Sequence, residues 1–340
     1  MDIKEAIARV VDGIDLTREE AADAIRALMT GDATAAQIGA LLTALRMKGE
    51  TTEEVTGAAS VMRELATRVT VDVPNLVDTC GTGGSGRKLF NVSTAAAFVA
   101  AAAGAHVAKH GNRGMTSLSG SADVLEAAGV SLDLSPEQVA RCISDVGVGF
   151  LFAQRHHSAM KHVSGARREI GVRTLFNVLG PLTNPAGAPA QVLGVFDGAW
   201  QQRIAEVLRA LGSRHVLVVH AADGLDEISL AGATRVVELK AGEIGTYEIS
   251  PATFGIAEAD IEELRADSPA ASLALVRAAL RGEGAAADIV ALNAGAAIYA
   301  ADVATTLENG VRMAQDAIAS GLARERLDEL ARISSLMAEG

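Results

Sequence analysis

Aromatic residues are scarce in this chain. Only 3% of its 340 residues are Phe, Trp or Tyr, although 49% are hydrophobic. The core must therefore be built from Ala, Val, Leu and Ile in closely packed helices. The hydrophobic content excludes a disordered chain, and the length is sufficient for one large or two ordinary domains.

An excess of positive charge is also lacking. The formal net charge is −12, which argues against general nucleic-acid binding but leaves room for a local basic cleft. Cys80 and Cys142 are the only cysteines and have no metal-site spacing, as expected for reduced thiols in the cytosol. The apolar run 94–108 is too short to span a bilayer, and the acidic N-terminus has no signal-peptide core. We expect a cytoplasmic protein that binds neither nucleic acid nor membrane.

The common nucleotide-binding motifs are absent, since the chain contains neither GxxxxGK[ST] nor a dinucleotide fingerprint. It has instead a glycine-rich stretch, 81–86, between an apolar run ending at Asp78 and a helix start near 91–94. Free backbone amides and a helix N-terminus favour an anion there. A second polar loop, 109–117, adds two cations and several hydroxyls. Two such loops predict a ligand with phosphates at two ends.

The first seventy residues are typical of helices alone. Thr17 with Glu20, and Thr51 with Glu54, each have the spacing of a capping box. Apolar residues between these boxes recur at helical spacing. No residue pattern here indicates chemistry, so we interpret the segment as a small helical domain that serves packing or dimer contact.

Strands and helices alternate from residue 75 onward. Short βα units of this kind predict a central, mostly parallel sheet flanked by helices, hence an α/β domain. Two runs around a polar turn, 235–239 and 245–249, predict a hairpin at the sheet edge. The expected strands are 76–79, 106–108, 149–152, 191–195 and 215–220, and the expected helices are 93–103, 121–128, 135–146, 199–211 and three or four more after 272.

One connection is longer than an ordinary crossover. About forty residues separate the strands expected near Phe150 and Val192. We expect this insertion to fold back onto the N-terminal helices. The predicted domains are then 1–70, joined by about 160–190, and 75–340, interrupted by the same insertion. A ligand site would lie in the cleft between them.

Several stretches, in this order, carry a family resemblance: GTGG, FNVST, KHGNR, SGSAD, HHSAMKHV, RTLFNVLGPLTNP and DGLDE. Together they resemble the anthranilate phosphoribosyltransferase family over roughly residues 5–335. The resemblance implies transfer of a 5-phosphoribosyl group from phosphoribosyl pyrophosphate to the amino group of anthranilate, with release of pyrophosphate, in tryptophan biosynthesis. It also implies magnesium, with two ions per active site, and a homodimer.

The resemblance assigns site residues by position. No nucleophile–base pair is evident, so catalysis would rest on positioning and electrostatics, with His110 orienting the acceptor. The implied anthranilate-binding residues are Gly81, His110, Asn112, His157 and Arg167, and the implied magnesium ligands are Ser93, Asp226 and Glu227. The implied donor-binding residues are Gly81, Gly84, Ser85, Leu89, Asn91, Val92, Ser93, Thr94, Lys109, His110, Gly111, Asn112, Arg113, Gly114, Met115, Thr116, Ser117 and Ser121.

The sequence departs from the family pattern in the first loop. Ser85 stands where the family usually has an acid, and Leu89 where it usually has threonine. Arg87 and Lys88 precede Leu89, so the loop exchanges negative for positive charge. Donor binding could remain, aided by one of these cations.

Two other readings are open. A pyrimidine nucleoside phosphorylase of related fold shares a phosphate site with a lysine and glycines, and a non-enzymatic relative could bind nucleic acid. The adjacent acids Asp226 and Glu227 can both reach one cation, although a solvated acidic loop would look the same and Asp223 lies nearby. These acids favour the transferase. So does Arg167, because a guanidinium can bind a carboxylate through two hydrogen bonds.

Overall fold

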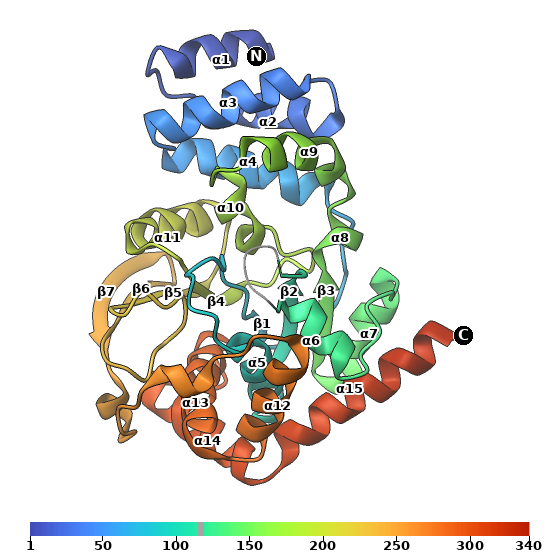
Figure 1. The fold of residues 1–340 in the computed structure, drawn as a ribbon, viewed down its shortest axis with the longest axis vertical. Helices are drawn as coiled ribbons and strands as arrows, with labels where there is room; N and C mark the ends of the chain where they lie inside the picture. Colours follow the sequence, from blue (N-terminus) through green and yellow to red (C-terminus); the bar gives the residue numbers. More distant parts are fainter. Residues whose placement is uncertain (115–118, 340) are drawn as a thin grey trace.

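A computed structural model describes residues 1–114 and 119–339 of the chain. The predicted donor residues Met115, Thr116 and Ser117 therefore lie outside the described part. The first seventy residues contain helices and no strand, as predicted (Figure 1, blue). Both predicted capping boxes are present. The helices are α1 (Ile3–Val11), α2 (Arg18–Thr30), α3 (Ala35–Lys48) and α4 (Thr52–Leu65).

The rest of the chain builds a seven-stranded sheet in the order β3-β2-β1-β4-β5-β6-β7. The first five strands are parallel, and β6 and β7 form an antiparallel hairpin at one edge. The predicted mostly parallel sheet and its edge hairpin are confirmed. The strands are β1 (Leu76–Asp78), β2 (His106–Gly111), β3 (Val148–Phe152), β4 (Ala190–Gly194), β5 (His215–Ala221), β6 (Thr234–Lys240) and β7 (Glu243–Ile249).

Helices cover the sheet, and α5 packs centrally against the C-terminal helices (Figure 1). No described helix is both long and apolar enough to cross a membrane. These helices are α5 (Val92–Ala102), α6 (Ser121–Ala127), α7 (Pro136–Val146), α11 (Gln201–Ala210), α12 (Pro269–Leu280), α13 (Gly284–Ala300), α14 (Leu307–Ala319) and α15 (Leu322–Glu339). The insertion holds α8 (Ala153–His156), α9 (Lys161–Ile170) and α10 (Phe176–Leu179).

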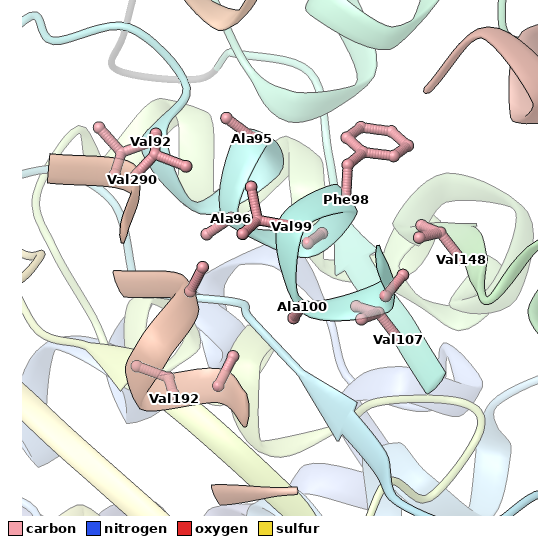
Figure 2. Packing of buried hydrophobic residues seen from close by; sticks show 14 of the residues in the cluster. Val92, Ala95, Ala96, Phe98, Val99, Ala100, Val107, Val148, Val192 and Val290 are labelled. Carbon is pink, nitrogen blue, oxygen red and sulfur yellow. The ribbon is translucent and has the colours of Figure 1, made fainter. Parts of the chain in front are cut away.

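Alanine packing explains the scarcity of aromatic residues. The α5 helix is buried along most of its length, and its alanines let α13 and the sheet approach closely (Figure 2). Val290 of α13 lies in this cluster with Val92 and Val99 of α5. Between α13 and α14, a Cβ on Gly310 would lie 2.3 Å from the Gly295 carbonyl oxygen, so this crossing requires glycine.

The insertion lies against the N-terminal helices. Helix α9 packs on α2 and α3, and Val163, Ala166 and Leu175 share one buried core with α1–α4. The Thr67 amide donates to the His156 carbonyl oxygen at 2.8 Å, which ties the end of the helical part to α8. We therefore propose the domain division given above, with 160–190 joining residues 1–70.

One expectation about the second loop was wrong. Lys109 and His110 do not lie in a loop, because β2 continues to Gly111. The reason is pairing with β3, which matches Lys109 with Phe150 and His110 with Leu151.

Candidate active site

The predicted site residues gather where the parallel strands end. The glycine-rich loop follows β1, and the segment 222–227 follows β5. Lys109 and His110 lie near the carboxyl end of β2. The carboxyl ends of parallel strands share one edge of a sheet, which is where ligands bind in open α/β folds. Helix α5 begins at the same edge, so Ser93 lies in its first turn.

Lys109 is the buried cation of this edge, with 3% of its surface exposed. Its Nζ atom donates to the carbonyl oxygen of Thr79 at 3.0 Å, and to the hydroxyls of Thr79 and Ser93 at 3.3 Å each. Burial lowers the pKa of Lys109, while the negative charges of Asp78 and Glu227 act in the opposite direction. An ammonium whose direct partners are neutral oxygens has charge available for a phosphate.

Of the two acids after β5, Glu227 lies against Ser93, and Asp226 is its neighbour in the chain. Burial and the nearby charge of Asp226 together raise the pKa of Glu227 to about 8, although Lys109 and Ser93 act in the opposite direction. Both acids are half-buried. A Cβ on Gly194 would lie 1.7 Å from the Asp226 carbonyl oxygen, so glycine lets this segment approach β4.

A small cavity of about 10 Å³ opens between these groups. Its walls include Thr79, Gly81, Ser93, Glu227 and Asn293. A hydroxyl and two neighbouring carboxylates are oxygen donors, which magnesium prefers. The ionised form of Glu227, whose pKa is raised, would also be stabilised by a cation. These residues therefore fit a magnesium site.

A second donor set lies nearby but has different chemistry. Single donor atoms of Asp78, Cys80 and His110 lie within 4.8 Å of one another. Thiol and imidazole donors suit softer metals than magnesium. The Asp78 carboxylate moreover already accepts two hydrogen bonds, from His110 N and Asn184 Nδ2.

Two histidines face each other on the other side of β2. The ring centroids of His110 and His157 are 5.1 Å apart, and the residues are 3% and 6% exposed. None of their four ring nitrogens has a hydrogen-bond partner of normal geometry among the described residues. Burial lowers the pKa of His157 to about 4 and that of His110 well below its usual value, so both are neutral near pH 7.

Arg167 lies on α9, in the helical part. Burial lowers its pKa, and its guanidinium lies 5.2 Å from the centre of the Phe176 ring. No acidic residue in 1–114 or 119–339 forms an ion pair with it. A half-buried, planar cation without a carboxylate partner suits a carboxylate ligand.

The glycine-rich loop needs its glycines. Gly83, Gly84 and Gly86 have φ of 62°, 82° and 77°, a conformation that other residues rarely adopt. The Arg87 guanidinium donates to the Asp223 carbonyl oxygen, and Leu89 forms a β-bridge with Arg265. The cation that distinguishes this loop from the family pattern thus joins it to the segment bearing the two acids.

The remaining predicted residues have different surroundings. Asn91 holds Ser119 and Ser272 through its Oδ1 atom, at 3.1 and 2.7 Å. Arg113 points to α6, where it pairs with Asp123 and Glu126. Val92 and Thr94 are buried, whereas Ser85, Gly111, Asn112 and Ser121 are half-buried and Gly114 is exposed.

Sequence reasoning missed four buried polar residues at this edge: Asp78, Thr79, Asn184 and Asn293. Asn293 accepts from the Ile228 amide at 2.9 Å and donates to the Ile228 carbonyl oxygen at 2.9 Å, which fixes the chain beside Glu227. The available signal was a single amide within the otherwise apolar run of α13. Asn184 likewise interrupts a run of apolar residues.

Comparison with known proteins agrees with this geometry. Residues 4–66 match the glycosyl transferase family's helical bundle domain, and 73–324 match its a/b domain. A protein from Thioalkalivibrio sulfidiphilus named anthranilate phosphoribosyltransferase is 61% identical over 331 residues, or 97% of this chain and 98% of the relative. This chain belongs to the anthranilate phosphoribosyltransferase family. It is thus a pentosyltransferase of the glycosyl transferase class.

Solved structures of the family have the same fold. The anthranilate phosphoribosyltransferase from Thermus thermophilus superposes with a TM-score of 0.92 at 46% identity, covering 97% of this chain and 99% of that one. The enzyme from Saccharomyces cerevisiae, in complex with PRPP and Mg, gives 0.89 at 26% identity, with 98% of each chain covered.

Proposed function

We propose that this chain transfers the 5-phosphoribosyl group of phosphoribosyl pyrophosphate to the amino group of anthranilate, a step of tryptophan biosynthesis. The bond between the amine nitrogen and ribose carbon 1 forms. The bond from that carbon to pyrophosphate breaks, pyrophosphate leaves with the electron pair, and the new amine releases a proton. The observation that carries the proposal is Lys109, a buried cation near Ser93 and Glu227.

Strand β2 supports separate sides for donor and acceptor. Successive side chains of a strand point to opposite faces, so Lys109 reaches Ser93 on one face while His110 meets His157 on the other. We assign the Lys109 side, with the glycine-rich loop and α5, to the donor. The His110 side, with His157, Gly81, Asn112 and Arg167, would hold anthranilate.

The acceptor side suits a flat acid with a neutral amine. Two neutral imidazoles leave the amine unprotonated and add no competing charge. Arg167 would hold the carboxylate and so turn the amine towards the ribose. No general base is assigned, because orientation and charge stabilisation of the leaving group carry the reaction.

We assign Ser93, Asp226 and Glu227 as the residues that would hold magnesium, with two ions per active site. Magnesium held by these residues would supply positive charge to offset that of pyrophosphate. Within the protein, Lys109 balances the acid pair, and Arg87 joins the two segments that border this cavity.

We also propose a homodimer formed through the helical domain, in the cytoplasm. Val11, Ile14 and Met47 are large apolar residues of this domain that are 67%, 47% and 83% exposed. Both cysteines are free, as expected in a reducing compartment. Light scattering at micromolar concentration should give twice the chain mass, and the mass of one chain would contradict the dimer.

Anthranilate fluorescence tests the reaction. Emission should fall when protein, phosphoribosyl pyrophosphate and magnesium are present together, and should persist when any one is omitted. Constant emission, with phosphorolysis of a pyrimidine nucleoside instead, would favour the phosphorylase. Retardation of nucleic acid at physiological salt without either activity would favour the binding protein.

A further inference from the structure

Two buried side chains without a role so far, Asp78 and Asn184, form a pair beside β2. The Asp78 carboxylate accepts from the His110 backbone amide at 3.1 Å and from Asn184 Nδ2 at 2.7 Å. Asn184 Nδ2 also donates to the Ala108 carbonyl oxygen at 2.8 Å. Asp78 is 1% exposed and Asn184 is 8% exposed. The pair therefore holds two backbone groups of β2, two residues apart.

Those backbone groups lie where β1 leaves β2. The two strands pair only at Leu76 with His106 and Val77 with Val107. Along a parallel strand, alternate residues direct their amide and carbonyl groups to the same neighbour. The His106 amide donates to Asn75 on the β1 side, and the Val107 amide donates to Gly147 on the β3 side. Ala108 and His110 therefore also face the β1 side.

Beyond Val77 the described pairing of β1 with β2 ends, because Asp78 is the last residue of β1 and pairs with Gln191 of β4 before the chain turns into the glycine-rich loop. Buried backbone groups without partners are costly. The side chains of Asp78 and Asn184 supply the missing acceptor and donor. The two strands can thus separate at their carboxyl ends, where the ligand cavity opens, without losing hydrogen bonds.

We propose that Asp78 and Asn184 are positioning residues, which replace the missing β1 backbone and fix Lys109 and His110 at the end of β2. Neither residue contacts substrate in this role. The inference rests on the proposed function, because that reaction gives Lys109 to the donor and His110 to the acceptor.

The chemistry of the pair supports a role beyond stability. Burial raises the pKa of Asp78 to about 6, although the hydrogen bonds from Asn184 and His110 act to lower it. A buried carboxylate is an expensive way to accept two hydrogen bonds, and such groups concentrate at functional sites. Asp78 also lies near Lys109, whose positive charge it helps to retain.

The expected kinetic effect differs from that of a binding residue. Lys109 and His110 are consecutive, so a shift of their backbone would misalign donor and acceptor together. Misplacement by about 1 Å can cost roughly 100-fold in rate. We expect Asp78→Asn and Asn184→Asp each to lower kcat by about 10- to 100-fold. Each KM should change by less than about threefold, since a contact to either substrate is not removed.

A double variant that exchanges the two residues tests for rescue of activity. Asp78→Asn leaves one side-chain acceptor for two donors, the His110 amide and Asn184 Nδ2. Asn184→Asp places two carboxylates together, so each single variant loses at least one of these hydrogen bonds. Asp78→Asn with Asn184→Asp restores one donor and one acceptor between the two positions and leaves an oxygen at position 78 for the His110 amide, although the Ala108 carbonyl oxygen still lacks its donor. We expect the kcat of the double variant to be about tenfold higher than that of the poorer single variant.

A matched control lies at the start of helix α11. Gln201 is fully buried and donates to the carbonyl oxygens of Val218 and Arg235 at 2.8 Å each. Gln201→Leu should lower the urea midpoint but leave kcat within about twofold, because it removes comparable hydrogen bonds away from the cavity. Circular dichroism and urea titration would establish that each variant is folded.

The outcomes separate the hypotheses. Folded single variants with wild-type kcat, or a double variant no better than the poorer single variant, would overturn the positioning role. If Asp78→Asn and Asn184→Asp do not fold, Asn184→Ala is tested by the same kcat criterion. An Asn184→Ala protein with a lower urea midpoint but an unchanged kcat would overturn the proposal. Absence of anthranilate turnover by the unmodified protein would instead overturn the proposed function.

Discussion

The Nζ atom of Lys109 lies 3.3 Å from the hydroxyl oxygen of Ser93. This contact joins the end of β2 to the first turn of α5, two segments that are separate in sequence. It also places a fixed positive charge beside the hydroxyl that we assign to magnesium. Lys109 and a metal held by Ser93 would thus both act on the charge of the leaving group.

Arg167→Ala should weaken anthranilate binding and leave donor binding nearly unchanged. Loss of a charge-assisted pair costs about 1.5–3 kcal/mol, or roughly 10- to 100-fold in the KM for anthranilate. Lys109→Ala should instead raise the KM for the phosphoribosyl donor. Steady-state kinetics with each substrate varied would measure both, with Arg168→Ala as the control, because Arg168 is the exposed neighbour on α9. If Arg167→Ala raised only the KM for the phosphoribosyl donor, our placement of the anthranilate site would be wrong.

Replacing Asp226 with Asn and Glu227 with Gln together should make turnover depend more steeply on magnesium. The two carboxylates are oxygen ligands suited to this ion, and their loss should be partly compensated by a higher concentration. Initial rates over a magnesium series would measure the effect. Asp223→Asn serves as the control, because its carboxylate is bound to Ser229 at 2.7 Å. Identical magnesium curves for the double variant and the unmodified protein would remove both acids from the site.

Stability should fall on the acid side because of His157. Burial lowers its pKa from 6.5 to about 4, so between these values the unfolded chain binds the proton that the folded protein lacks. The free energy of unfolding then decreases as pH falls from 6.5 towards 4, by up to about 1.4 kcal/mol per pH unit for this group. Urea titrations of His157→Gln should show a shallower decrease, and the exposed His162→Gln should not. An unchanged slope in His157→Gln would contradict this assignment.

Two glycines in helices should respond to alanine in opposite directions. Gly310→Ala puts a methyl group 2.3 Å from the Gly295 carbonyl oxygen and should cost about 1–3 kcal/mol through overpacking. A Cβ added to Gly165 on α9 would have no atom within 4 Å, so Gly165→Ala should gain about 0.5–1 kcal/mol from helix propensity. Thermal or urea unfolding would compare them, and equal effects would count against the close α13–α14 crossing.

The fold was predictable where pattern and period agree. Alternating apolar runs and capping boxes predicted every strand of the sheet and the helical start of the chain. The extension of β2 was not predictable, because Lys109 and His110 look like loop residues in sequence. They are strand residues because β3 provides a partner for them, and such a tertiary contact overrides local polarity.

The site was predictable mainly through its motifs. Gly81, Ser93, Lys109 and Glu227 do lie around one cavity edge. Asp78 and Asn184 were missed because their role depends on how far β1 and β2 pair, which no local spacing encodes. The burial of the two acids after β5 was missed for a related reason, since Gly194 of another strand permits it.

The shared core of α1–α4 and the insertion has a consequence for synthesis on the ribosome. Val163 and Ala166 belong to that core, yet they follow the end of α4 by about 98 residues, counted from Leu65 to Val163. At about 5–20 residues per second, the first four helices emerge roughly 5–20 s before these partners. During that interval their apolar face is open to solvent and to other chains. Nascent chains of this protein should therefore engage chaperones early, before the sheet is complete.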